Sequence, residues 1–295
     1  MTTLQLLING VALGAAYALV ALGFVLVLNA TSAVNFAQGD LVMAGGLLAV
    51  ALAPHIHLLG IPLPGIALLP LTILLMAALG LMIALVAYLP LRNRPPVGVF
   101  ISTIATGIIL QNGATILFGP EPRAAPPLFS GGTVDLGGLV VAEQSLAIIA
   151  VAAVLIAAQQ WVFARTQLGR RLRATAQDPE MARACGVPVT AMILVTFALG
   201  AAYAGAAGLL LANRYFVTPT AGGDLILKAY IAVTIGGWGS VPGAVVGALL
   251  IALFEVGVSS VLSYPVALGA LYATLLVILV ARPQGLFGEA ARRRA

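Results

Sequence analysis

The stretch LLINGVALGAAYALVALGFVLVL, residues 6–28, decides the fold class of this chain. Its 23 positions hold no charged residue. The hydrocarbon core of a bilayer is about 30 Å thick, and a helix needs roughly 20 consecutive apolar residues to cross it. Gly10 and Gly14 lie four positions apart within the stretch, a spacing at which small residues let membrane helices pack closely. Residues 6–28 are therefore expected to span a membrane and to pack against other helices.

Similar apolar runs follow along the whole chain. They lie near 41–53, 65–89, 98–118, 144–163, 189–212, 225–239, 242–262 and 265–281. The 295 residues are 61% hydrophobic and 8% charged, whereas soluble domains are about 25% charged. The sequence predicts an all-α integral membrane protein of about eight to nine transmembrane helices, folded as a single domain over residues 1–295. The runs 41–53 and 225–239 are short for a crossing, so each is predicted to belong to a broken helix.

Basic residues in short loops mark the cytoplasmic ends of membrane helices. All of the 14 Lys and Arg residues except Arg123, Arg214 and Lys228 fall into three clusters. The clusters are Arg92 and Arg94; Arg165, Arg170, Arg171, Arg173 and Arg183; and Arg282, Arg292, Arg293 and Arg294. Placing all three in the cytoplasm predicts an external N-terminus, about nine crossings and an internal C-terminus. The net charge of +5 then follows from membrane orientation, and charges confined to helix ends predict no nucleic-acid partner.

A short sequence echo divides the chain into two halves. The echoes are LGAAYA at 13–18 and 199–204, and Gly-Asp-Leu at 39–41 and 223–225. In the predicted orientation the first copy descends toward the cytoplasm and the second ascends from it. The pattern favours an inverted repeat with half-repeats 1–163 and 189–281, joined by the cytoplasmic segment 164–188, and with the substrate path between the halves. Chance similarity between alanine-rich helices is the alternative.

The sequence carries no signature of an ATPase or of an ion-coupled carrier. A P-loop needs Gly-Lys followed by Ser or Thr, but the only lysine, Lys228, lies between a leucine and an alanine. A carrier driven by protons or sodium would normally show several intramembrane acids, and Glu255 is the one acid deep within an apolar run. Glu255 is either a buried acid paired with a polar group of a neighbouring helix or a residue of the transport path.

Two other classes of protein are disfavoured. A stand-alone secondary carrier would share the composition and the repeat, and removing ATP from a reconstituted system would identify it. An intramembrane hydrolase would need a nucleophile and a base inside the bilayer, but His55 and His57 lie in a Pro-bounded segment. No further His or Cys stands beside them to complete a metal shell, so neither a metal site nor a cofactor nor a catalytic residue is expected.

A capped helix is predicted in the cytoplasmic segment. Asp178 suits the N-cap, Pro179 the first helical position and Gly186 the position after the C-terminus. These signals bound a helix of about two turns, Pro179 to Cys185, which is too short to be stable alone in water. The residues expected on its apolar ridge are Met181, Ala182 and Cys185. The ridge favours docking into the groove of a partner, and a helix resting on the membrane surface is the alternative.

Several local motifs occur in order along the chain. They are Asn9-Gly10 with Gly14 and Tyr17-Ala18-Leu19; residues 34–40, VNFAQGD; Gln111-Asn112; the stretch from Arg173-Ala174 through Asp178 to Gly186; residues 236–244, GGWGSVPGA; and residues 282–288, RPQGLFG. Through their order and spacing the sequence resembles, nearly end to end, the inner-membrane permeases of ABC importers for branched-chain amino acids, of the LivH type. Gln38 and Asp40 stand where that family usually has His and Glu. This departure leaves the solute open, because relatives carry urea, short amides or aromatic acids.

The resemblance implies a permease that forms, with a second permease, a path across the bacterial inner membrane. The further partners that it implies are two cytoplasmic ATP-binding subunits and a periplasmic solute-binding protein; the second permease would be LivM-like, either identical to this chain or different. The residues expected to couple the chain to an ATPase are Asp178, Pro179, Met181, Ala182, Cys185 and Gly186. The residues expected in the path or at the permease interface are Asn35, Gln38, Asp40, Gln111, Asn112, Gly236, Gly237, Gly239 and Ser240. Unwound backbone at membrane depth persists only where protein or a watery cavity covers it, and for Gln111 and Asn112 hydrogen bonding between packed helices is the alternative.

Overall fold

The computed structural model describes residues 3–55, 57–58, 61–62, 64–129, 132–135, 140–282 and 284–287. Of the third basic cluster only Arg282 is described, so the predicted cytoplasmic position of residues 292–294 lies outside the described residues. The same holds for Pro283 and Gly288 of the last motif and for the side chains of His55 and His57.

Seven helices in these residues are long and apolar enough to cross a membrane. They are α1 (Thr3–Thr31), a span at Gly65–Leu91 built on α3 (Leu68–Ile83), α4 (Pro96–Phe118), α5 (Glu143–Arg165), α8 (Val189–Arg214), α10 (Val241–Val261) and α11 (Tyr264–Ala281). Two shorter apolar helices, α2 (Gln38–Leu52) and α9 (Gly222–Gly236), have 15 residues each. The predicted all-α membrane class is confirmed, and the two short runs form short helices.

Helical turns of other types extend α2 and α3. The 3-10 turn η1 (Ala53–His55) follows α2, and the 3-10 turn η2 (Gly65–Ala67) leads into α3. After α3 the chain passes through a π-helical turn, η3 (Ala84–Tyr88), and the 3-10 turn η4 (Leu89–Leu91). The Gly65–Leu91 span therefore changes its helical pitch toward the end that carries Arg92 and Arg94.

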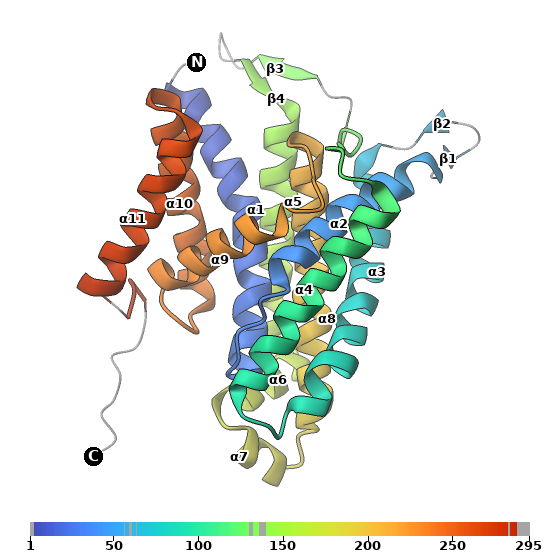
Figure 1. Ribbon diagram of the computed structural model, residues 1–295, viewed down its shortest axis with the longest axis vertical. Coiled ribbons are helices and arrows are strands. Elements are labelled where there is room, and N and C mark those ends of the chain that lie inside the picture. The colour runs from blue at the N-terminus through green and yellow to red at the C-terminus, as the bar shows by residue number, and fades with distance from the viewer. Residues whose placement is uncertain are drawn as a thin grey trace.

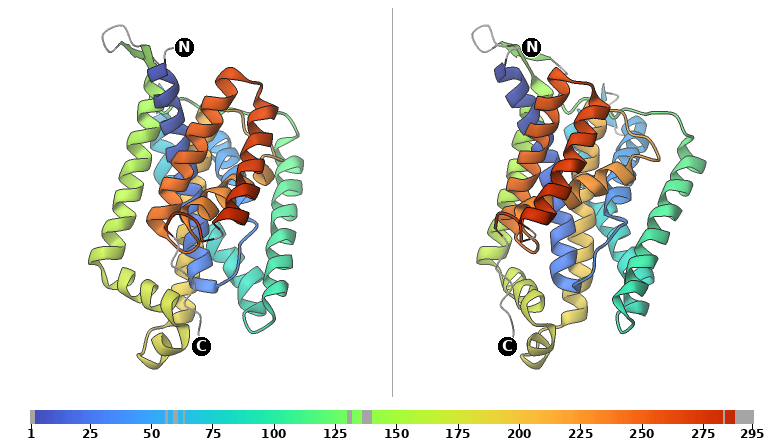
Figure 2. Two further views of the ribbon diagram at one scale, coloured as in Figure 1. Left: turned by 90° about the vertical axis from the view of Figure 1, so that its left-hand side faces the viewer. Right: turned by 60° about the vertical axis from the view of Figure 1, so that its left-hand side comes forward.

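The centre of the bundle is formed by α1 and α8, which lie side by side (Figures 1 and 2). α1 also packs against α5, α9 and α10, and α8 packs against α2 and α3. Most of α1 is buried, whereas α4, α5 and α11 expose apolar side chains such as Ile116, Val154 and Val280. Exposed apolar faces on the outer helices are the pattern of helices that face lipid or another membrane subunit.

The two short helices begin in the interior of the bundle, part-way along its long axis (Figure 1). Each follows a non-helical segment, residues 32–37 before α2 and residues 215–221 before α9. A Cβ atom on Gly39 would overlap the carbonyl oxygen of Gly222, so the first turns of α2 and α9 are in direct contact. The order of long helix, non-helical segment, short helix and two long helices occurs in α1–α4 and again, running in the opposite direction, in α8–α11 (Figure 1).

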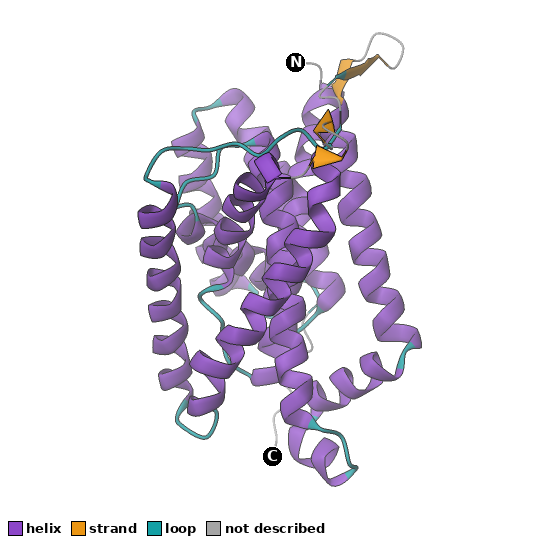
Figure 3. Ribbon diagram, turned by 90° about the vertical axis from the view of Figure 1, so that its right-hand side faces the viewer, coloured by secondary structure: helices purple, strands orange, loops and turns teal. Residues whose placement is uncertain are grey.

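The two ends of the bundle differ. Two small antiparallel hairpins lie at the end where α1 begins; they pair β1 (His57–Leu58) with β2 (Ile61–Pro62) and β3 (Thr133–Asp135) with β4 (Val140–Ala142). The helices α6 (Gln167–Gln177) and α7 (Pro179–Ala184) lie at the opposite end (Figure 3).

The residues that follow α11 return to the end of α9. The backbone N–H of Leu286 donates to the carbonyl of Ile235 at 2.8 Å, and that of Phe287 donates to the carbonyl of Gly236 at 3.0 Å. The last carbonyls of a helix have no partner within it, so this segment supplies partners that α9 lacks.

Candidate functional site

The predicted cytoplasmic helix is present as α7. The Asp178 carboxylate accepts hydrogen bonds from the backbone N–H groups of Glu180 and Met181, both at 2.9 Å. Pro179 is the first helical residue. Gly186 has a φ of +80°, a left-handed conformation that glycine adopts without steric cost. The capping signals in the sequence thus identified both ends of the helix, which stops at Ala184 with Cys185 as its C-cap.

The apolar ridge predicted on α7 needs a correction. Met181 is 64% exposed and Cys185 is also exposed, but Ala182 is only 5% exposed and packs against the chain's own apolar core. The carbonyl of Ala182 accepts a hydrogen bond from the N–H of Val187 at 2.9 Å. Ala182 therefore holds the short helix to the bundle, and Met181 with Cys185 makes up the exposed part.

An amphipathic helix that the sequence reading did not single out, α6, supports α7. Thr166 caps α6 by accepting a hydrogen bond from the N–H of Gly169 at 3.1 Å. Leu172 and Thr175 are buried, while the arginines of α6, Arg170, Arg171 and Arg173, are exposed. The signal was available in the sequence as apolar positions at helical spacing among arginines.

The residues predicted around the start of α2 are buried inside the chain and do not form its surface. Asn35, Gln38 and Asp40 are all buried. The Gln38 side chain donates to the carbonyl of Gly200 in α8 at 3.0 Å, and Gln111 in α4 donates to the Asp40 carboxylate at 2.7 Å. Gln38 and Asp40 therefore bind elements of their own bundle, and the place of these three residues in the path or at the permease interface stays a prediction.

The neighbours Gln111 and Asn112 point in different directions. Gln111 reaches inward to Asp40, whereas Asn112 is exposed and donates to the carbonyl of Ile108 one turn earlier in α4, at 2.8 Å. The contact of Gln111 is a hydrogen bond between two packed helices, which was the alternative to a role in the path. Asn112 contacts no other helix through this bond.

The turn between α9 and α10 is built by residues that the sequence reading selected. Gly237 and Gly239 have φ values of 105° and 82°, and the Ser240 hydroxyl caps α10 by accepting from the N–H of Gly243 at 3.1 Å. The Asn29 side chain donates to the carbonyl of Gly239 at 2.9 Å. Gly239 and Ser240 border a cavity of about 510 Å³ that α1, α5 and α6 also line, whereas Gly236 packs directly against the backbone of Gly243.

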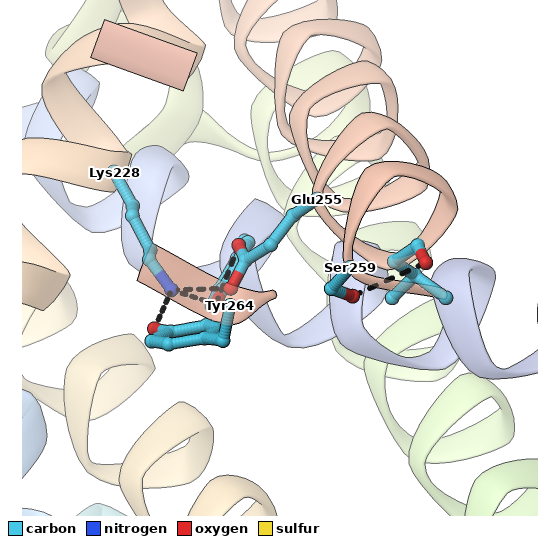
Figure 4. A network of polar contacts seen from close by, with 6 residues as sticks. Lys228, Glu255, Ser259 and Tyr264 are labelled. Carbon is cyan, nitrogen blue, oxygen red and sulfur yellow. Dashed lines mark hydrogen bonds and ion pairs between the residues drawn. The ribbon is translucent and has the colours of Figure 1, made fainter. Parts of the chain in front are cut away.

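A buried polar cluster joins α1, α9, α10 and α11. The Lys228 amino group lies 2.7 Å from a carboxylate oxygen of Glu255 and 2.8 Å from the Tyr17 hydroxyl, to which it donates. Tyr17 donates to the other oxygen of Glu255 at 3.2 Å, and Lys228 reaches the Tyr264 hydroxyl at 3.3 Å (Figure 4). Glu255 is paired with a polar group of a neighbouring helix, as one of its two alternatives expected, and it also lines a cavity, so its place in the transport path stays a prediction. The sequence analysis did not identify Lys228 as the partner of Glu255. The signal for a buried charge was present, because Lys228 lies within the apolar run 225–239.

The polar cluster lies on one wall of a cavity of about 440 Å³. The segment before α9 contributes Tyr215 and Phe216, which are exposed, and α9 contributes Asp224. Within the described residues no group of three or more His, Cys, Asp or Glu side chains could hold a metal ion. The cavity therefore has charged groups on one wall and mainly apolar side chains on the other.

The apolar spanning helices make this chain a multi-pass membrane protein. The chain belongs to the family of permease components of branched-chain amino acid transport systems, whose family model matches residues 6–281. It is 32% identical over 294 residues to the high-affinity branched-chain amino acid transport permease BraD of Pseudomonas aeruginosa, which covers 97% of this chain and 96% of BraD. It is 33% identical over 297 residues to the corresponding permease LivH of Escherichia coli K12, again covering 97% and 96%.

More distant relatives carry other names. A 143-residue region, 46% of this chain and 40% of the relative, is 33% identical to the fructose import permease FrcC of Rhizobium meliloti. No solved structure matches the chain. Membership of the permease family confirms the resemblance inferred from the ordered motifs.

Proposed function

We propose that this chain is the membrane-spanning subunit of an ABC importer in the bacterial inner membrane, and that it forms with a second permease the path for branched-chain amino acids. The observation that carries the proposal is the match to BraD and LivH over 97% of the chain. A correspondence of this length includes α6 and α7 as well as the spanning helices, so the whole architecture is shared and not one motif.

The proposed orientation places the α6–α7 end of the bundle in the cytoplasm. The exposed arginines of α6 lie there, and the turn that carries Arg92 and Arg94 lies at the same end (Figure 1). Basic residues concentrate on the cytoplasmic side of membrane proteins. The N-terminal end of α1 and the two hairpins then face the periplasm, where a solute-binding protein would dock.

The proposed motor consists of two cytoplasmic ATPase subunits, one of which receives α7. A capped helix of six residues cannot persist on local bonds alone, and Ala182 supplies the contact with the bundle. Met181 is left exposed at the cytoplasmic end, and a flexible thioether suits an apolar groove that changes shape. Met181 is therefore the proposed anchor, with Cys185 beside it.

The proposed path lies between the proposed half-repeats 1–163 and 189–281, in which α1–α4 and α8–α11 follow the same order and run in opposite directions. Transporters built in this way place the solute near the membrane midplane, at broken helices. The direct contact between the first turns of α2 and α9 supports this assignment. Because Gln38 and Asp40 are buried against α8 and α4, their departure from the usual His and Glu alters packing and carries no argument for urea, short amides or aromatic acids as the solute.

The proposal is tested in proteoliposomes that contain the chain with its partner permease, ATPases and binding protein. We expect L-leucine to accumulate only when ATP and the binding protein are both present. Accumulation without ATP would identify a secondary carrier. ATP-driven uptake of urea or of an aromatic acid, with no uptake of leucine, would correct the solute.

The coupling assignment has its own variant. Met181→Asp is expected to place a charge in an apolar groove at a cost of several kcal/mol, which separates ATP hydrolysis from uptake while the membrane domain stays folded. Met181→Leu is the matched control and should keep both activities. Normal assembly with the ATPases and normal uptake by Met181→Asp would remove α7 from the coupling path.

A further inference from the structure

The 440 Å³ cavity beside α9 has two kinds of wall. One wall carries the amino group of Lys228 and the carboxylate of Glu255, with the hydroxyls of Tyr17 and Tyr264 around them (Figure 4). The remaining wall is mostly aliphatic, with Leu13, Val42, Leu211, Leu225 and Val256, and it also carries the exposed Asp224. The volume falls within the range of about 300–1,000 Å³ typical of sites for small molecules. The cavity is shaped for a small molecule that is polar at one end and aliphatic at the other.

Fold stability alone is a weak reason for an ion pair at this place. Lys228 and Glu255 are each only 5% exposed, and taking two charges out of water costs about as much as their attraction returns. Lys228 is also the only lysine of the chain. Ionisable side chains within membrane segments are rare, usually face the bundle interior or a cavity, and mark substrate or ion paths. Both side chains of this pair line the cavity.

The pair matches the charges of one class of solute. An α-amino acid carries an ammonium and a carboxylate on the same carbon atom, so its carboxylate can meet Lys228 while its ammonium meets Glu255. The two side chains neutralise each other at 2.7 Å. When such a zwitterion enters, each charge exchanges one opposite partner for another, and no charge is left unpaired. An amine or a carboxylic acid would satisfy one side chain and leave the other without a partner, which is costly in a buried site.

We propose that Lys228 and Glu255 form a transit site for the α-ammonium and α-carboxylate groups of an amino acid, with the side chain of the solute against the aliphatic wall. This inference rests on the proposed function, because it assigns the place where that permease contacts its solute. The exchange of one paired state for another predicts weak binding, as a path requires if the solute is to leave again. Tyr17 and Tyr264 contribute hydroxyls to the same wall.

The test uses a reporter cysteine in the same cavity. Ser259 lines it, so Ser259→Cys is introduced into the complete transporter in proteoliposomes, and maleimide labelling at position 259 is followed by peptide mass spectrometry. The probes are L-leucine, isoamylamine, which lacks the carboxylate, and 4-methylpentanoate, which lacks the ammonium. We expect L-leucine at about twice its dissociation constant to slow labelling about threefold, as simple occupancy requires, and the other two probes at the same concentration to have little effect. Equal protection by all three probes, or by none, overturns the site.

Variants of the pair separate recognition from folding. Lys228→Met with Glu255→Leu removes both charges together and leaves no buried charge unpaired, so assembly should be kept and protection by leucine lost. Lys228→Glu with Glu255→Lys restores a complementary pair and should restore protection. Protection that persists in an assembled transporter with Lys228→Met and Glu255→Leu overturns the inference. If that double variant does not assemble, the comparison of the three probes on the parent chain decides.

Failure of the site and failure of the proposed function give different results. ATP-driven uptake of leucine is measured with the unmodified chain under the same conditions. Absent uptake overturns the proposed solute. Uptake by the unmodified chain together with equal protection by leucine, amine and acid leaves the proposed function standing and overturns only the transit site.

Discussion

The first turns of α2 and α9 have the same Gly-Asp-Leu sequence and opposite surroundings. In α2, Asp40 is buried and accepts a hydrogen bond from Gln111 of α4. In α9, Asp224 is exposed and borders the 440 Å³ cavity. The Asp40 side chain is therefore enclosed by packing, whereas the Asp224 side chain faces a cavity. Both helices contribute to that cavity, α2 through Val42, so the neighbouring helices decide which of the two aspartates faces it.

The glycines of the two turns provide the largest expected contrast. A Cβ on Gly39 would overlap the Gly222 carbonyl, whereas a Cβ on Gly223 would meet nothing within 4 Å. We expect Gly39→Ala to destabilise the fold by about 3 kcal/mol through overpacking. Gly223→Ala is the matched control and should stabilise it by up to about 1 kcal/mol, since alanine favours the helix. Thermal unfolding in detergent measures both effects. Equal unfolding midpoints for the two variants would contradict the close contact between Gly39 and Gly222.

The neighbours in α4 give the next contrast. Gln111→Leu removes the side-chain donor to the buried Asp40 carboxylate and is expected to cost about 2 kcal/mol, because the carboxylate is left without its partner. Asn112→Leu removes only a bond to the backbone one turn earlier and should change the unfolding midpoint little. A larger loss for Asn112→Leu, measured by the same thermal unfolding, would mean that α4 is rotated from the position described.

The two aspartates themselves are expected to differ by a smaller amount. Asp40→Ala leaves the amide of Gln111 without an acceptor and should cost about 1.5 kcal/mol. Asp224→Ala removes a charge from the exposed first turn of α9 and should cost only about 0.5 kcal/mol. Denaturation curves of the two variants measure both losses of stability. A larger loss for Asp224→Ala than for Asp40→Ala would contradict the described burial of the two aspartates.

Asp178 adds a third aspartate at a helix start, on the surface. Its carboxylate accepts two backbone N–H groups of α7. Asp178→Ala is expected to weaken this cap by about 0.5 kcal/mol, the low end for caps, with a slightly lower uptake rate and an unchanged global unfolding midpoint. Asp178→Asn keeps the capping oxygen and serves as the control. A loss of uptake as severe as that expected of Met181→Asp would show that Asp178 does more than cap.

The spanning helices and the capped helix could be predicted because their signals are local. Apolar runs, Asp178-Pro179 and Gly186 each act within a few residues, and each appears in the structure where the sequence placed it. The burial of Gln38 and Asp40 could not be predicted in this way. Their partners, Gly200 and Gln111, lie 162 and 71 residues away in the sequence. The residues around Gln38 and Asp40 do not indicate which distant residues they contact.

The partners within the polar cluster could not be predicted from the sequence either. Glu255 was recognised as an isolated acid in an apolar run, but its partner Lys228 lies 27 residues earlier in a different helix. The turn at 237–240 brings α10 back against α9. Pairing between charges on adjacent helices depends on that turn and on helix rotation, and the sequence pattern specifies neither closely enough.

The return of residues 286 and 287 to the end of α9 has a consequence for the order of events during synthesis. The carbonyls of Ile235 and Gly236 receive their hydrogen bonds from Leu286 and Phe287, which leave the ribosome some fifty residues later, several seconds at ordinary rates of translation of about 5–20 residues per second. During that interval α9 has no such partners at its C-terminal end. The C-terminal end of α9 is thus completed only after α10 and α11 have been made.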